Sequence, residues 1–111
     1  MTVDSWSEHI LVGELQDDPL FTDDLAALLE EVDTKTNVDV VLNFANVSYL
    51  NSSNIAKLLK LRKKVTANRQ RLILAGIDTT VWGIFLVTGL DKVFEFAESI
   101  ATALAAAQIG D

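Results

Sequence analysis

Four consecutive polar side chains, Asn51, Ser52, Ser53 and Asn54, carry the most chemistry in this sequence. They precede an apolar pattern with helical spacing, so their oxygens can accept hydrogen bonds from the unpaired N–H groups of a first helical turn. The same N–H groups and the helix dipole favour an anion, and a phosphate on a serine there adds about −1.5 to −2 charge. Ser52, and less strongly Ser53, are therefore candidate phosphorylation sites. Simple helix capping by Asn51 or Ser52 is the alternative.

A second polar group, Asp78, Thr79 and Thr80, precedes another helical pattern. Helices that follow parallel strands begin at the same edge of the sheet, so this group is expected beside the first one. A capping role for Asp78 or Thr79 is expected there. Trp82 follows at once and is either an exposed anchor for a protein partner or a ring packed against the loop before Asn51.

The other reactive side chains do not form a catalytic set. The carboxylates of Asp17/Asp18 and Asp23/Asp24 are adjacent in sequence, which turn and cap roles explain, and His9 has no evident acid partner. The sequence contains no cysteine, so it has no thiol nucleophile and no thiolate for a metal. We therefore expect a protein that is not an enzyme and that holds neither a metal nor a cofactor.

Charge and composition limit the class of partner. The 111 residues fit one domain over 1–111, and a net charge of −7 argues against nucleic acid. Seven of the nine basic residues lie between Lys57 and Arg71, and Lys57, Lys60 and Lys64 form one helical stripe that either meets an acidic partner or is only solvated. No membrane insertion is expected, because no apolar run reaches about 20 residues. No secretory signal is expected either, because the N-terminus has no basic region followed by an apolar stretch. A cytoplasmic location follows as an expectation.

Strand-like and helix-like segments alternate along the chain, which predicts an α/β fold with helices covering a sheet. In the second helix, Ile55, Leu58 and Leu59 are expected to face the core, and Asn68 to end the helix in a left-handed conformation. The predicted strands cover 9–15, 38–44, 72–77 and 93–96. The predicted helices begin at a Thr22 cap, at Asn51, at 81 (ending at Gly89) and at a Ser99 cap.

Three local patterns follow one another along the chain, and their order and spacing together are informative. They are Leu11-Val12-Gly13-Glu14-Leu15, Val40-Val41-Leu42-Asn43-Phe44 followed by Asn51-Ser52-Ser53-Asn54-Ile55, and Leu86-Val87-Thr88-Gly89-Leu90-Asp91-Lys92-Val93-Phe94. Together they resemble the STAS family, the domain of sulfate transporters and anti-sigma factor antagonists, over nearly the whole chain from His9. Asn51 and Asn54 stand where the antagonists of that family carry Asp and Gly.

The resemblance implies a mixed β-sheet flanked by about four helices, packed mainly on one face. It implies a switch protein that binds a kinase-type, ATP-binding anti-sigma factor, with phosphorylation at Ser52 blocking the binding and a serine phosphatase as a second partner. The partner surface would then include Asn51, Ser53 and Asn54, the lysine stripe, Thr79, Thr80 and Trp82.

Two other functions remain open from the sequence. One is an accessory subunit of a transport ATPase, which would dock constitutively and need no phosphoserine. The other is a ligand-sensing STAS domain that uses a pocket of its own.

Overall fold

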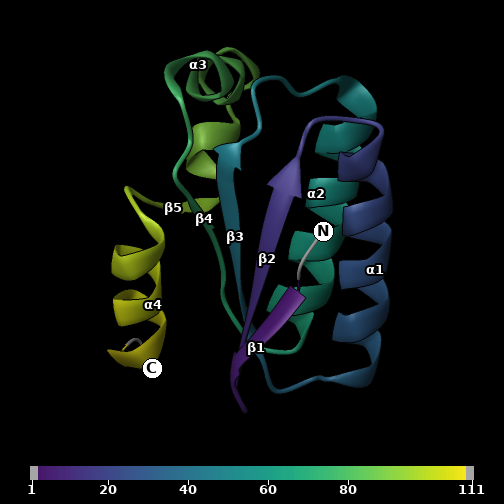
Figure 1. The fold of residues 1–111 in the computed structure, drawn as a ribbon, viewed down its shortest axis with the longest axis vertical. Coiled ribbons are helices and arrows are strands. Elements are labelled where there is room, and N and C mark those ends of the chain that lie inside the picture. The colour runs from purple at the N-terminus through teal and green to yellow at the C-terminus, as the bar shows by residue number, and fades with distance from the viewer. Residues whose placement is uncertain (1–2, 110–111) are drawn as a thin grey trace.

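The computed structural model describes residues 3–109 as a five-stranded sheet with helices on both faces (Figure 1). In chain order the elements are β1 (Val3–Ser7), β2 (Ile10–Gln16), α1 (Leu20–Thr34), β3 (Asp39–Asn46), α2 (Ser52–Ala67), β4 (Leu72–Ala75), α3 (Thr79–Thr88), the short 3₁₀ turn η1 (Leu90–Lys92), β5 (Glu95–Ala97) and α4 (Ile100–Ile109). The strands lie in the order β1-β2-β3-β4-β5. The first pair is antiparallel and the other three pairs are parallel. The predicted mixed α/β sheet with four helices is confirmed.

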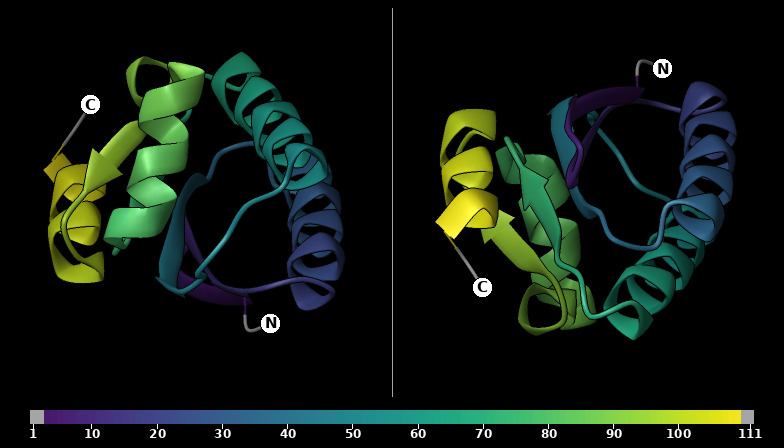
Figure 2. Two further views of the ribbon diagram at one scale, coloured as in Figure 1. Left: turned by 90° about the horizontal axis from the view of Figure 1, so that it is seen from above. Right: turned by 90° about the horizontal axis from the view of Figure 1, so that it is seen from below.

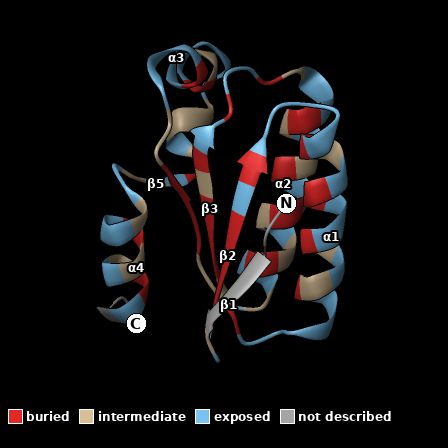
Figure 3. Ribbon diagram, viewed as in Figure 1, coloured by how far each residue is buried: buried red, intermediate tan, exposed pale blue. Residues whose placement is uncertain are grey.

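The larger core lies between the sheet and the inner faces of α1, α2 and α3, whereas α4 covers the opposite face (Figure 2). Strand β3 shows how one segment serves both cores, because side chains alternate between the faces of a strand. Val40, Leu42 and Phe44 lie in the larger cluster, and Val41 lies in the smaller one beside α4. Burial on both sides explains why this strand reads as a nearly continuous apolar run (Figure 3).

The N-terminal part of the sheet differs from the prediction. Strand β1 was not assigned from the sequence, and it pairs with β2 across a tight turn that includes His9. His9 therefore lies in a turn and not in the strand that was predicted to begin there. Its neighbour Ile10 opens β2 and is buried.

The start of α1 also differs from the prediction that Thr22 caps it. The helix begins at Leu20, two residues earlier, directly after Pro19. Proline suits the beginning of a helix because its fixed φ matches the helical value and it has no N–H group to leave unpaired. Thr22 is not the cap: its backbone N–H and its hydroxyl both donate to the Asp18 carboxylate, at 3.0 Å and 2.8 Å.

The inner face of α2 agrees with the prediction at Leu58 and Ile55 and differs from it at Leu59. Leu58, Leu61 and Val65 are buried, while Leu59, which was predicted to face inward, is 37% exposed. Ile55 is partly buried and packs against the core cluster, as predicted.

The end of α2 turns at Arg69 and not at Asn68, where the left-handed residue was predicted. Asn68 keeps a φ of −84°, and Arg69 takes a φ of +62°. The backbone N–H of Gln70 donates to the carbonyl of Val65, and that of Arg69 donates to the carbonyl of Thr66, the two bonds of a Schellman motif. Arg69 thus occupies the position that most often holds glycine.

Arg69→Gly should raise the free energy of unfolding by about 0.5–1 kcal/mol, because glycine adopts positive φ without the steric cost of a Cβ atom. Asn68→Gly is the matched control. The φ of Asn68 is already favourable for any residue, so this substitution should only increase the conformational entropy of the unfolded chain and lower the free energy of unfolding. Urea unfolding of both variants tests the assignment, and a gain at position 68 instead of 69 would contradict it.

Candidate functional site

The candidate site lies at the edge of the sheet where the parallel strands end. Helices α1, α2 and α3 each begin just after such a strand, so their N-termini face the same edge, at the top of Figure 1. Among the predicted site residues, this arrangement brings the start of α2 and the start of α3 to one side of the molecule. The grouping follows from the alternation of parallel strands and helices, because each helix begins where the preceding strand ends.

A reciprocal pair of asparagines forms the start of α2. The side-chain oxygen of Asn51 accepts a hydrogen bond from the backbone N–H of Asn54 at 2.8 Å, and the side-chain oxygen of Asn54 accepts from the backbone N–H of Asn51 at 3.1 Å. This is a capping box in which asparagine takes both roles. The predicted capping role of Asn51 is confirmed, and the Asn54 side chain is almost fully buried.

Asp18 ties this capping box to the turn before α1. Its Oδ2 atom accepts hydrogen bonds from the side-chain amides of Asn54 at 2.9 Å and Asn51 at 3.2 Å. Its Oδ1 atom accepts from the hydroxyl of Thr22 at 2.8 Å. Chiefly the hydrogen bond from Asn54, and then that from Thr22, lower the pKa of Asp18 from 3.8 to about 2. An ionised carboxylate therefore lies beside the first turn of α2, although Asn51 itself carries no charge.

Asp17 fixes the loop that leads into α2. Its carboxylate accepts hydrogen bonds from the hydroxyl and the backbone N–H of Ser48, and from the backbone N–H of Tyr49 at 3.4 Å. The hydrogen bond from the Ser48 hydroxyl is the main reason why the pKa of Asp17 is lowered. The two aspartates thus have structural roles in a turn, as the sequence indicated. Apart from Thr22, their partners are more than 30 residues away and could not be found from the sequence.

Ser52 and Ser53 are both exposed, and their hydroxyls differ in their surroundings. The Ser53 hydroxyl accepts a hydrogen bond from the ammonium group of Lys57 at 3.1 Å. The Ser52 side chain makes no hydrogen bond within residues 3–109. Among the described residues, Ser52 is therefore the serine at the start of α2 whose hydroxyl is not engaged by another side chain.

The predicted lysine stripe is only partly available. Lys64 forms an ion pair with Asp33 of α1 at 2.6 Å, and Lys57 is engaged with Ser53. The exposed Lys60 has no such contact in the described part of the chain. The stripe therefore serves the packing of α1 against α2 as well as any partner.

At the start of α3, Asp78 caps the helix by accepting a hydrogen bond from the backbone N–H of Val81 at 2.8 Å, as predicted. Thr79 and Thr80 are exposed beside it. Trp82 is 37% exposed, and its ring packs edge-to-face on Phe96 with the centroids 5.0 Å apart. That neighbour belongs to β5 and is not the loop that the sequence suggested.

Two apolar side chains near the start of α2 were missed from the sequence. Tyr49, in the loop before α2, is 62% exposed, and Leu20, at the start of α1, is 44% exposed. Tyr49 lies in the loop that Asp17 holds by a contact 32 residues away, and the sequence gives no signal for that contact. Exposed aromatic side chains are common anchors of protein interfaces.

The Asp18 network should make stability depend on acid pH. The pKa of Asp18 is lower in the folded chain than in the unfolded chain, so its contribution is fully present above about pH 4 and is lost as the pH falls towards 2. Asp18→Asn should be less stable than the parent at neutral pH and should lose less on acidification. Urea midpoints between about pH 5 and pH 2.5 measure this. Asp23→Asn, a nearby exposed acid, is the control and should keep the parental pH profile.

Within residues 3–109, no group of three or more His, Cys, Asp or Glu side chains is placed to bind a metal ion. Over the same residues, each helix is too short or too polar to cross a lipid bilayer.

Comparisons with known proteins agree with the fold and with the sequence patterns. A family model described as STAS domain matches residues 3–103. The anti-sigma-B factor antagonist of Staphylococcus epidermidis is 28% identical over 98 residues, which cover 88% of this chain and 89% of that protein.

Two solved structures of similar fold come from the same group of proteins. An anti-sigma-factor antagonist (STAS) domain protein from Planctomyces limnophilus superimposes with a TM-score of 0.84 at 16% identity, over 96% of this chain and 97% of that one. The Bacillus anti-sigma factor antagonist SpoIIAA in its unphosphorylated form superimposes with a TM-score of 0.74 at 16% identity, over 99% and 98% of the two chains.

Proposed function

Because this chain belongs to the STAS domain family, we propose that it is an anti-sigma factor antagonist controlled by phosphorylation of Ser52. In this proposal it binds a kinase-type anti-sigma factor through the edge where α2 and α3 begin. A relative that is 28% identical carries the name of such an antagonist, which supports the choice of partner. The protein would act by binding and would perform no catalysis itself.

The observation that carries the proposal is the position of Ser52. Its hydroxyl is exposed at the first residue of α2, while the capping is done by the flanking Asn51 and Asn54. A hydroxyl that is not needed for capping can be modified without losing the helix start. In the phosphorylation step the Ser52 oxygen would attack the γ-phosphorus of ATP, the bond from that phosphorus to the leaving ADP oxygen would break, and a base of the kinase would accept the hydroxyl proton.

The electrostatics of the site support a change in binding and not in folding. A phosphate on Ser52 would stand close to the ionised Asp18, which contacts Asn51 and Asn54 on either side of it. The phosphate would therefore add its negative charge to that of Asp18, at a surface that also exposes Tyr49 and Leu20. A partner that covers this surface in the unmodified state would have to bury an unpaired dianion in the modified state.

The test is phosphopeptide mapping after incubation with ATP and the cognate anti-sigma factor kinase. We expect phosphate on Ser52, none in Ser52→Ala, and an unchanged yield in Ser53→Ala. Phosphate on Ser53 alone, or none with a kinase proven active on another antagonist, would contradict the proposal.

A constitutive docking subunit, for example of a transport ATPase, is the second candidate. Helix α3 favours it, because Trp82, Leu86 and Val87 expose an apolar surface that does not depend on Ser52. In that case the Ser52→Ala and Ser52→Asp variants would bind the partner equally well.

A further inference from the structure

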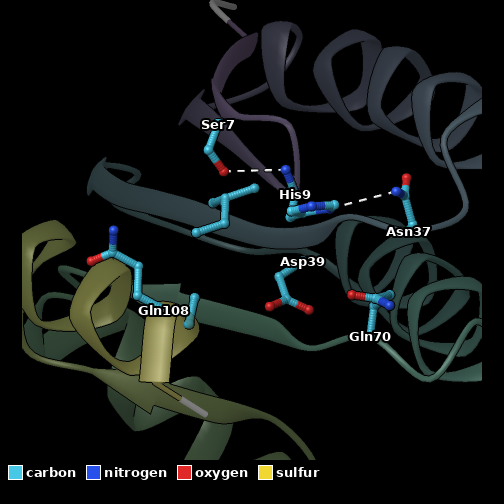
Figure 4. Close-up of a pocket in the computed structure, with 8 residues that line it drawn as sticks. Ser7, His9, Asn37, Asp39, Gln70 and Gln108 are labelled. Carbon is cyan, nitrogen blue, oxygen red and sulfur yellow. Dashed lines mark hydrogen bonds between the residues drawn. The ribbon is translucent and has the colours of Figure 1, made fainter. Parts of the chain in front are cut away.

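A polar pocket lies at the opposite edge of the sheet, where the parallel strands begin (Figure 4). Four segments that are distant in sequence meet around it: the β1–β2 turn, the start of β3, the connection from α2 to β4, and the end of α4. The pocket has a volume of about 540 Å³. Sites for small molecules commonly measure about 300–1,000 Å³, so its size fits a small organic ligand.

The carboxylate of Asp39 is held in a fixed position at this pocket. The backbone N–H of Asp39 donates to the carbonyl of His9 at 2.7 Å, and the Oδ1 atom of Asp39 accepts from the backbone N–H of Arg71 at 2.8 Å. The Oδ2 atom makes no hydrogen bond within residues 3–109. One oxygen thus secures the side chain to the backbone just before β4, and the other remains available to a ligand.

The remaining lining decides the class of that ligand. Among the lining residues that the structure describes, Asp39 is the one carboxylate, and none is a lysine or an arginine. The polar lining also includes His9 and Gln70, whose groups can hydrogen-bond a polar ligand, while the buried Ile10 and Ala107 provide an apolar patch.

The guanidinium group of Arg71, the nearest cation to Asp39 in these contacts, is engaged by Glu95 and by the carbonyl of Ala106. An anion in the pocket would therefore meet the Asp39 charge with no lysine or arginine among these lining residues, whereas a cation would be attracted.

We propose that this pocket binds a small organic amine, with the ammonium group at Asp39 and the alkyl part against Ile10 and Ala107. The ammonium group can donate to the available Oδ2 atom and form a charge-assisted hydrogen bond. The Nδ2 atom of Asn37 lies 3.5 Å from the Nδ1 atom of His9 and helps to hold the imidazole at the rim of the pocket (Figure 4). This proposal is independent of the switch at Ser52, which lies at the other edge of the sheet.

The test uses butane-1,4-diamine as the probe and butane-1,4-diol as its uncharged counterpart, with NMR detection on the full chain. At about 0.15 M salt, which screens diffuse attraction to the acidic surface, the diamine should shift the amide signals of Ile10, Asp39, Gln70 and Ala107 saturably. The diol should bind at least tenfold more weakly. Shifts spread over the whole acidic surface, or no saturable shift up to about 10 mM probe, would overturn the proposal.

Two substitutions separate the pocket from general charge effects. Asp39→Asn removes the charge but retains an oxygen for the Arg71 N–H group, and it should weaken diamine binding at least tenfold. Gln70→Glu adds a carboxylate to the same pocket and should tighten binding severalfold, which damage to the fold could not mimic. Asp23→Asn removes a charge elsewhere and should change nothing. An equal loss of binding in Asp39→Asn and Asp23→Asn would overturn the proposal.

Discussion

Leu58→Ala should lower the free energy of unfolding by about 2–5 kcal/mol, whereas Leu59→Ala should lower it by less than about 1 kcal/mol. The two leucines are neighbours on α2, with the same helix propensity and the same change in size. Leu58 is fully buried in the main core, and Leu59 is 37% exposed. The difference between the variants therefore isolates the burial of one side chain.

Urea unfolding at neutral pH measures both changes, and the slope of the unfolding curve shows whether the comparison is sound. Leu42→Ala, in the fully buried middle of the sheet, should behave like Leu58→Ala. Equal losses for Leu58 and Leu59 would show that α2 is rotated relative to the face described above.

The orientation of α2 could not be predicted from the sequence because three leucines compete for the inner face. Leu58, Leu59 and Leu61 all lie in one stretch, and several helical faces contain two of them. The structure places Leu58, Leu61 and Val65 inward because α1 and the sheet meet the helix from that side. Helical periodicity was thus sufficient to predict the helix but not its rotation.

The start of α2 was predictable for a local reason, and its neighbours were not. Asn51 and Asn54 are three residues apart, so their mutual capping lies within the reach of a sequence pattern. Asp18 reaches Asn54 across 36 positions, and a single sequence carries no signal for such a contact. The helix start and the candidate serine could therefore be predicted, whereas the carboxylate beside them emerged only from the fold.

The same distinction applies at the ends of elements. Gly89 ends α3 with a φ of +74°, as its residue type indicated. At the end of α2, Asn68 is the residue that more readily adopts a left-handed conformation, yet Arg69 adopts it. The preference of asparagine for a left-handed conformation is weak compared with the requirement to direct the chain from α2 into β4. The prediction therefore placed the left-handed residue one position too early.

The charge at Ser52 is the feature of the proposed switch that can be changed most directly. Ser52→Asp should lower the affinity for the anti-sigma factor at least tenfold, or about 1.4 kcal/mol, while the melting temperature shifts by only a few degrees. A charge at an exposed helix start changes stability by about 0.3–1 kcal/mol, which is small beside a total of about 5–15 kcal/mol. The same charge inside a protein interface can cost several kcal/mol.

Ser53→Asp is the matched control, because it adds the same charge one residue further along α2. The ammonium group of Lys57 already contacts the Ser53 hydroxyl at 3.1 Å, so an aspartate there would be paired within its own helix. We therefore expect a smaller loss of affinity for Ser53→Asp than for Ser52→Asp, and normal binding for Ser52→Ala. Titration calorimetry with the purified anti-sigma factor gives the affinities, and thermal unfolding of each variant alone gives the stabilities. Equal losses at both positions would indicate a general charge effect on the surface, and no loss at Ser52 would favour the constitutive docking subunit.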